Sequence, residues 1–298
     1  MSDSLLYKYV NIATLKHILG GSIRMTQPGA FNDPFELLPE IVVPRDQTEV
    51  SLNLSFDLLA PRRTGAAEAV VSTSEELVAS DFTSRNILDV LNKQVGILCL
   101  SKSPNSILMW SHYADQYKGA VVAFDGNHEF FQYPISVEYV SERPRWHIDS
   151  YGSETIPLAE LCAKSQDWEY EQEVRLIRSL HDCNEIGQPD ARGFPIFVKQ
   201  VPREAIVTVA LGERTPVSEQ REIYNLLRET KIGLTLSAVD NVGYGFRQEM
   251  ILYAGELRNP TISPRTAHIF AGTDSPLAQV AQHIIDSHPL SPLVNKLA

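Results

Sequence analysis

Short runs of apolar residues recur along this sequence more often than helical patterns do. Alternation with a period of two places successive side chains on opposite faces of a strand, and a short continuous apolar run indicates a buried strand. These patterns predict strands over residues 5–9, 96–100, 119–125, 135–139, 173–178, 194–199, 205–211, 233–239 and 250–254. Helical spacing is less frequent and grouped, which predicts an α+β fold with a mixed, largely antiparallel sheet.

Helices are predicted where apolar residues recur at a spacing of three or four behind capping residues. Asn11 is a candidate N-cap for a helix over 11–20, and Ser103 with Pro104 predicts a second helix that runs to about Lys118. Segment 45–93 is predicted to hold one or two surface helices.

The domain organisation follows from a change in composition near residue 258. Residues 1–258 carry the strand patterns and all the motifs, so they are predicted to form a single catalytic-type α+β domain. Residues 259–298 are rich in proline and hold one short helical pattern around 277–285, which predicts a C-terminal appendage.

Charge and cysteine content restrict the partners. The chain has 26 Lys and Arg against 37 Asp and Glu, a formal charge of -11, which opposes non-specific binding to duplex DNA. Its three cysteines are far apart, which fits a reducing compartment, and neither a signal peptide nor a long apolar run is apparent. The expected location is the cytoplasm, with no membrane association.

Common catalytic signatures are missing from the sequence. There is no dinucleotide-binding glycine motif, phosphate-binding loop, serine nucleophile elbow or zinc-protease helix motif, and the eight histidines are scattered. A resident metal is therefore not expected.

The first of three polar, aromatic-rich motifs is RMTQPGAFNDPFE, residues 24–36. Its Asn-Asp-Pro turn signal predicts a rigid loop with Asx-type hydrogen bonds, which Phe31 and Phe35 would anchor in the core. A loop held this way can also present polar groups to a ligand with little loss of entropy. Arg24 and Asn32 are therefore candidate binding residues.

The second motif continues the apolar run 96–100 as SKSPNSILMWSHYADQYKG. On one helix, Trp110, Tyr113 and Tyr117 would share a face, and an aromatic stripe at this spacing is typical of core packing. Tyr113 beside the polar His112 would equally suit a stacking platform for a flat ring.

The third motif is WEYEQEVRLI, residues 168–177. If a strand begins by Glu171, alternation places Glu171, Glu173 and Arg175 on one face and the apolar residues between them in the core. One interpretation is a solvated sheet face on which Arg175 pairs with a neighbouring carboxylate. The other is a functional surface that carries two carboxylates.

The motifs taken together in their order resemble a known family. LYKY, RMTQPGAFNDPFE, ILCLS, LMWSHYADQYKG and WEYEQEVRLI resemble a widespread bacterial family labelled as a domain of unknown function, over roughly residues 5–255. A more distant similarity is to the ADP-ribosyltransferase fold, which orders a strand and helix, a Ser-x-Ser segment before a helix, and a Glu-x-Glu before a strand. Residues 7–19, 101–113 and 171–173 follow that order.

The distant resemblance implies an NAD-consuming ADP-ribosyltransferase or NAD glycohydrolase, with NAD as substrate and an unknown protein or nucleic acid as acceptor. Such an enzyme would serve as a bacterial toxin or phage-defence effector. It implies that Glu173 holds the nicotinamide ribose, that Glu171 orients the acceptor and that Tyr113 stacks on nicotinamide. The implied NAD site also takes in Tyr7, Arg24, Asn32, Ser101 and His112.

The first strand departs from that pattern because Tyr7 and Tyr9 stand where an Arg or His is expected, and Arg24 is a substitute. The chemistry suits the residue types, since a carboxylate stabilises the oxocarbenium-like state in which the bond to nicotinamide breaks.

Two other functions remain open. A metal-dependent nuclease would use Asp125, Glu171 and Glu173 to bind Mg²⁺, with Arg175 in the place of the usual lysine. A non-catalytic module would instead use the loop and the glutamate face to recognise a small ligand or a protein.

Overall fold

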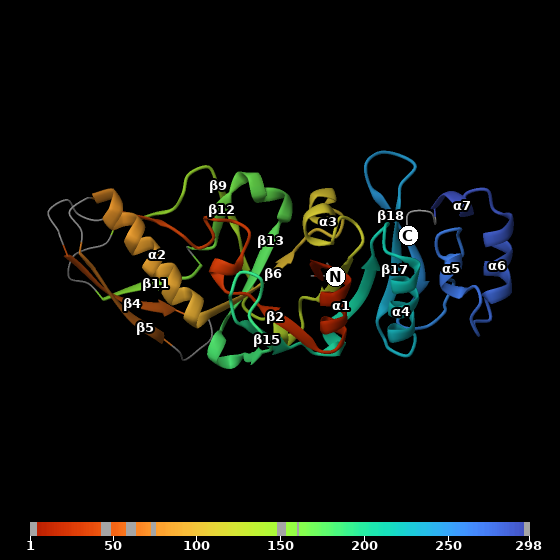
Figure 1. Cartoon of the computed structure of the whole chain (residues 1–298), viewed down its shortest axis with the longest axis horizontal. Coiled ribbons are helices and arrows are strands. Elements are labelled where there is room, and N and C mark those ends of the chain that lie inside the picture. The colour runs from red at the N-terminus through yellow and green to blue at the C-terminus, as the bar shows by residue number, and fades with distance from the viewer. Residues whose placement is uncertain are drawn as a thin grey trace. The chain divides into compact units, whose positions relative to one another are not determined.

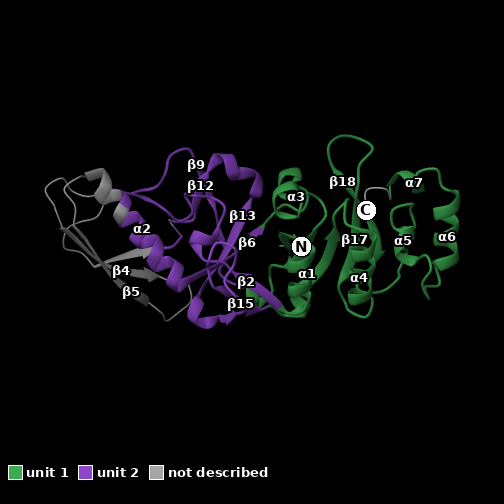
Figure 2. Cartoon of the chain, viewed as in Figure 1, with its two compact units in different colours: residues 1–21, 101–130, 201–298 green, residues 22–100, 131–200 purple. Residues whose placement is uncertain are grey.

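A computed structural model describes residues 5–42, 49–57, 64–72, 76–147, 153–159 and 161–294. The chain forms two compact units (Figure 2). Unit 1 comprises residues 1–21, 101–130 and 201–298, and unit 2 comprises residues 22–100 and 131–200. Segment 259–298 is part of unit 1, and its separation as an appendage to a single domain stays a prediction.

Unit 1 is built on five strands in the order β18-β17-β16-β7-β1, of which Figure 1 labels β17 and β18. Neighbours are antiparallel except β16 and β17, which are parallel. The strands are β1 (Leu5–Val10), β7 (Ala120–Asp125), β16 (Ile206–Leu211), β17 (Gly233–Val239) and β18 (Phe246–Leu252). The helices are α1 (Ile12–Leu19), α3 (Ile107–Tyr113), α4 (Val217–Leu227), α5 (Ala267–Phe270), α6 (Ala278–Ser287) and α7 (Ser291–Val294).

Helix α1 begins as predicted, because the Asn11 side chain accepts a hydrogen bond from the Thr14 amide at 2.7 Å. The prediction for the second helix is wrong at both ends. Helix α3 is capped by Ser106 and ends at Tyr113, because residues 115–117 all have positive φ angles. Left-handed backbone cannot continue a right-handed helix.

Unit 2 contains several small sheets and one long helix, α2 (Glu76–Gln94). Strands β6, β13 and β8 are neighbours in that order, as are β14, β15 and β2, and β11, β4 and β5. The pairs β12 with β9 and β10 with β3 are parallel. The strands are β2 (Ser22–Met25), β3 (Glu40–Val42), β4 (Glu49–Asp57), β5 (Thr64–Ser72), β6 (Val95–Ser101), β8 (Ile135–Ser136), β9 (Glu138–Val140), β10 (Arg145–His147), β11 (Ser153–Pro157), β12 (Ala163–Ser165), β13 (Glu173–Ser179), β14 (Asn184–Ile186) and β15 (Ile196–Gln200).

The predicted helical content of segment 45–93 is wrong in its first half, where β4 and β5 pair in antiparallel fashion. The sequence EVSLNLSFD over Glu49–Asp57 alternates apolar and polar residues, which is the period of a strand. The described part of the chain is thus α+β with largely antiparallel pairing, as predicted.

The core of unit 2 lies where α2 packs against the strands. Ile87 and Leu91 of α2 pack with Ile97 of β6 and Ile177 of β13, and all four are buried. Leu161 and Cys162, which precede β12, belong to the same cluster. This core fixes the start of β12 and the middle of β13, the two strands that carry the charged residues described below. Among the described helices, none is both long and apolar enough for a bilayer crossing.

Candidate functional site

Five charged side chains meet in the interior of unit 2. Glu36 comes from the loop after β2, Lys164 from β12, and Glu171, Glu173 and Arg175 from the third motif. All five are buried, with Arg175 fully so. Charged residues are rarely buried to this extent unless they are paired. We refer to these five residues as the charge cluster.

The backbone between Glu171 and Glu173 explains why both carboxylates reach the same place. A 3-10 helix, η3 (Gln166–Glu171), ends before β13 begins, and Gln172 between them has a φ of 45°. The prediction that the strand includes Glu171 is therefore wrong, although the prediction that Glu171, Glu173 and Arg175 share a surface agrees with their contacts.

Lys164 links the two carboxylates of the third motif. Its Nζ lies 2.8 Å from Glu171 Oε2 and 2.8 Å from Glu173 Oε2, and 3.8 Å from Glu36 Oε2. The ammonium also lies 5.3 Å from the centre of the Trp168 ring, within the range of a cation–π contact. The positive charge of Lys164 is thus shared among several partners.

Arg175 joins β13 to the first motif. Its Nε donates to Glu173 Oε1 at 2.8 Å, and its Nη2 donates to Glu173 Oε2 at 3.1 Å. The same Nη2 lies 3.0 Å from Glu36 Oε2, and Nη1 lies 2.6 Å from Glu36 Oε1. By contacting Glu173 and Glu36 together, Arg175 fixes the loop of the first motif to β13 over a sequence separation of 139 residues.

The charges of the cluster do not balance when all five groups are ionised. Three carboxylates face two cations, which leaves one excess negative charge. Burial raises the pKa of the Glu36 carboxyl, against the opposing effect of Arg175 and Lys164. Burial acts in the same direction on Glu173, but Arg175 and Lys164 outweigh it there and hold the pKa of that carboxyl well below its usual range. As the pH falls, Glu36 therefore takes up a proton before Glu173 does.

We expect the charge cluster to make stability depend on pH in the acid range. The folded-state pKa of Glu173 lies below its ordinary value of 4.5, so its stabilising contribution is complete above about pH 4.5 and is lost as the pH falls below that value. Glu36 has a raised pKa and acts oppositely, since its contribution is complete below pH 4.5 and is lost as the pH rises through its folded-state value.

Chemical denaturation at pH 7, 5, 4 and 3 checks this expectation on wild type and Glu173→Gln. The variant should lose less stability than wild type between pH 5 and pH 3, because it lacks the group whose folded-state pKa is depressed. Equal losses in the two proteins would show that Glu173 is not ionised in the folded state.

Backbone contacts hold the first motif in place on both sides of Glu36. Gly29 N donates to Asn92 Oδ1 of α2 at 2.7 Å, and Arg192 donates to the Phe31 carbonyl. After Glu36, Arg143 Nε donates to the Leu38 carbonyl at 2.5 Å. The sequence-based expectation of a rigid loop agrees with these contacts.

The aromatic anchors of this loop differ from the prediction. Phe31 is half-buried against the core of unit 2, as expected, but Phe35 is 60% exposed, so its prediction as a core anchor is wrong. The Phe35 ring instead lies 5.5 Å from the Arg143 guanidinium. The predicted Asx-type bond is present, since Asp33 Oδ1 accepts from Phe35 N at 2.9 Å.

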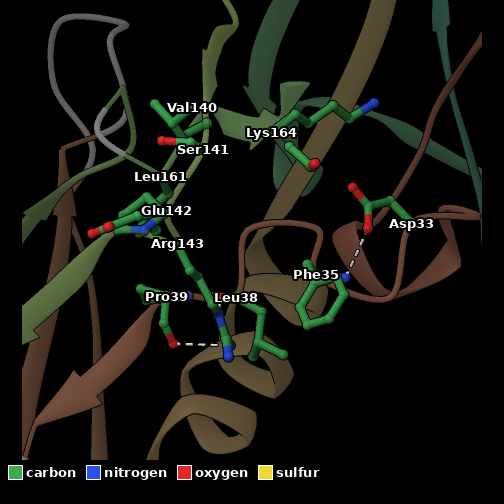
Figure 3. A pocket seen from close by; sticks show the side chains of 13 residues that line it. Asp33, Phe35, Leu38, Pro39, Val140, Ser141, Glu142, Arg143, Leu161 and Lys164 are labelled. Atoms are coloured by element: carbon green, nitrogen blue, oxygen red, sulfur yellow. Dashed lines mark hydrogen bonds between the residues drawn. The ribbon is translucent and has the colours of Figure 1, made fainter. Parts of the chain in front are cut away.

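A cavity of about 200 Å³ lies beside the charge cluster and shares Lys164 with it (Figure 3). Three segments line it: residues 33–39 of the first motif, residues 140–144 after β9, and residues 161–165 around β12. Its wall is largely apolar, and each of the three segments contributes at least one charged residue. The full lining consists of Asp33, Phe35, Leu38, Pro39, Val140, Ser141, Glu142, Arg143, Pro144, Leu161, Ala163, Lys164 and Ser165. A mainly apolar concavity with a few polar groups is typical of small-molecule sites.

The predicted site residues of unit 2 lie in three different environments. Glu171 and Glu173 meet in the charge cluster. Arg24 forms an ion pair with Asp190, with Nη2 and Oδ2 2.5 Å apart, so its guanidinium is already engaged by the protein. Asn32 is exposed on the loop.

The other predicted site residues belong to unit 1. Tyr7 of β1 stands opposite Ser101 at the end of β6, and the Ser101 hydroxyl lies 3.2 Å from the Ser103 carbonyl oxygen. His112 and Tyr113 are neighbours at the end of α3, with ring centres 6.2 Å apart. Their roles in NAD binding stay predictions.

The second motif contributes mainly to packing. Trp110 is buried, as predicted, and its ring meets the Tyr9 ring edge-on at 5.6 Å. Tyr117 lies outside α3, so the predicted shared helix face is wrong for this residue. It contacts Phe246 at 5.7 Å between ring centres.

Three important residues were not identified from the sequence. Glu36 is the last residue of the first motif, and an acidic residue flanked by Phe35 and Leu37 is a usable signal. Lys164 and Arg143 stand in segments without a motif, so only the tertiary structure reveals them. Within the described ranges, no group of three or more His, Cys, Asp or Glu side chains is placed to hold a metal ion.

Comparison with known proteins finds a family match over part of the chain. The family model described as "Protein of unknown function (DUF2971)" matches residues 109–176, a segment that includes most of the second motif and all but the last residue of the third. The predicted resemblance to a domain-of-unknown-function family is confirmed over those residues. Neither the curated proteins nor the solved structures provide a match.

Proposed function

We propose that unit 2 binds a small molecule in the cavity beside the charge cluster. The single observation that carries this proposal is that the cavity is lined by a loop that an arginine anchors in a buried ion-pair network. A preorganised wall lowers the entropic cost of binding. The charge cluster then acts as a support that joins two lining segments through Glu36 and Lys164, and Arg143 joins the third to the Leu38 and Pro39 carbonyls. A cytoplasmic location is part of the same proposal.

A cavity-filling variant tests this proposal. Ala163 is half-buried and lines the cavity, so Ala163→Leu adds three carbon atoms to it. We expect wild type to bind members of a library of small amines, alcohols and carboxylic acids in ligand-observed NMR. We expect Ala163→Leu to lose that binding while it keeps the wild-type melting temperature within a few degrees.

The matched control is Ala159→Leu, which places the same added side chain at an exposed position near the cavity segment but outside its lining. It should bind like wild type. Equal binding by wild type and Ala163→Leu would contradict the assignment of the cavity as the binding site.

The charge cluster also favours a second candidate function, the cleavage of NAD with release of nicotinamide. Lys164 and Arg175 keep Glu173 ionised despite its burial, and an ionised carboxylate is what an oxocarbenium-like state requires. Glu171 shares the Lys164 ammonium with Glu173, so the Glu-x-Glu pair acts at one place. Glu173 is 4% exposed, so contact with a ribose would require the residues that cover it to move. In this proposal NAD is a substrate, and the acceptor is a protein or a nucleic acid.

Incubation of the protein with NAD, with chromatographic detection of nicotinamide, tests the second function. If Glu173 is the catalytic carboxylate, Glu173→Gln should reduce the rate by a factor of about 10² to 10³. The stability of the variant must be measured in parallel, because loss of folded protein would also lower the rate. Nicotinamide release that is unchanged in folded Glu173→Gln would exclude Glu173 as the catalytic carboxylate. If wild type releases no nicotinamide, this second function is excluded and the binding function remains.

A further inference from the structure

The two cations in the cavity wall are already engaged by the protein. Lys164 Nζ lies 2.8 Å from each of two carboxylates. Arg143 donates from Nε to the Leu38 carbonyl and from Nη2 to the Pro39 carbonyl, at 2.5 and 3.1 Å. A ligand anion would therefore have to compete with two carboxylates for Lys164, and two of the three guanidinium nitrogens of Arg143 already donate to carbonyls.

Asp33 is the opposite case. Its side chain belongs to a residue only 6% exposed, and one carboxylate oxygen accepts from Phe35 N at 2.9 Å. Within the described part of the chain, no cationic group lies within ion-pair distance of this carboxylate, and its second oxygen has no hydrogen-bond donor. Figure 3 shows the carboxylate at the edge of the cavity, with the second oxygen directed away from Phe35. This oxygen is thus an available acceptor for a ligand donor, and a positively charged donor makes the stronger hydrogen bond to a carboxylate.

We infer that the ligand of this cavity is a small organic cation whose protonated nitrogen donates to Asp33 and whose apolar part packs against Leu38 and Leu161. The inference rests on the proposed binding function and specifies the chemistry of its ligand. Glu142 places a second carboxylate in the lining of the same cavity. The net charge of the whole chain, -11, also attracts cations over longer distances.

Three probes of nearly equal size and different charge test the inference: benzylamine, benzyl alcohol and benzoate. We expect benzylamine to bind wild type about ten to one hundred times more tightly than benzyl alcohol, because it adds a charge-assisted hydrogen bond to Asp33. Benzoate should bind more weakly than either. Affinities can be measured by NMR titration at pH 7, where the amine is protonated.

Asp33→Asn is the matched variant, because asparagine keeps the acceptor for Phe35 N and removes only the charge. It should abolish the preference for benzylamine over benzyl alcohol while it retains binding of the alcohol. Glu142→Gln removes an exposed carboxylate at the same cavity and should keep most of the preference.

Several outcomes would overturn the inference, and they separate it from the proposed function. If benzyl alcohol or benzoate binds wild type as tightly as benzylamine, and Ala163→Leu abolishes that binding, the cavity is a binding site but its ligand is not a cation. A preference for benzylamine that survives in folded Asp33→Asn would assign the recognition to another group. If none of the three probes binds in a way that depends on residue 163, both the inference and the proposed function fail.

Discussion

Replacement of Arg175 by methionine is expected to lower the free energy of unfolding by about 3 to 5 kcal/mol, the largest loss that we anticipate for a single substitution in unit 2. Arg175 is fully buried and contacts two carboxylates, those of Glu36 and Glu173. Methionine has a similar length and fills much of the same volume, so packing changes little. The loss comes from two buried carboxylates that then face each other with only Lys164 to compensate them.

Arg145→Met is the control for this prediction. Arg145 also pairs with a glutamate, Glu40, at 2.7 Å, but the two side chains are 64% and 41% exposed. Its replacement should change the stability little, since exposed ion pairs contribute little on average. Urea denaturation at pH 7 measures both variants. If Arg175→Met were as stable as Arg145→Met, the charge cluster would not hold the unit together.

The second large effect is expected from a matched pair of neutralised glutamates, Glu173→Gln and Glu36→Gln. Both carboxylates contact Arg175 and both are buried. Arg175 and Lys164 hold the pKa of Glu173 well below its usual range, whereas burial raises the pKa of Glu36. Removal of the charge should therefore cost more stability at Glu173 than at Glu36.

At pH 7 we expect Glu173→Gln to lower the free energy of unfolding by about 3 kcal/mol, and Glu36→Gln by about 1 kcal/mol or less. The two variants remove the same charge from the same cluster, so a difference between them reports on the unequal roles of the two groups. Equal losses, or a larger loss for Glu36→Gln, would contradict the opposite pKa shifts of the two carboxyls.

The sequence predicted the local features of the third motif and missed the interactions that give it its environment. The alternation of Glu173, Val174 and Arg175 correctly indicated a strand with the charged residues on one side. The same alternation also suggested that this side could be solvated, but every residue from Val174 to Ile177 is buried. Glu36 and Lys164 cover the charged side, and they lie far from the strand in sequence or outside any motif.

The cavity was not predictable from periodicity because its walls come from loops. Residues 33–39 and 140–144 are about one hundred positions apart and are joined by the bonds of Arg143 to the Leu38 and Pro39 carbonyls. An arginine in an irregular segment with no motif carries no pattern that identifies such a contact. The exposure of Phe35 was missed for a related reason, since a loop phenylalanine is usually buried, but here it lies at the cavity wall beside Arg143.

The most direct test of the binding proposal is an NMR titration of protein with labelled leucine and valine methyl groups. With benzylamine as the ligand, we predict saturable shifts of the methyl signals of Leu38, Val140 and Leu161, which line the cavity. The signals of Leu234, which is buried in unit 1, should not move. Saturable shifts at the three cavity residues that disappear in Ala163→Leu would support the binding proposal. Cavity signals that stay unchanged with saturating benzylamine, and with every other amine, alcohol and acid of the library, would contradict it.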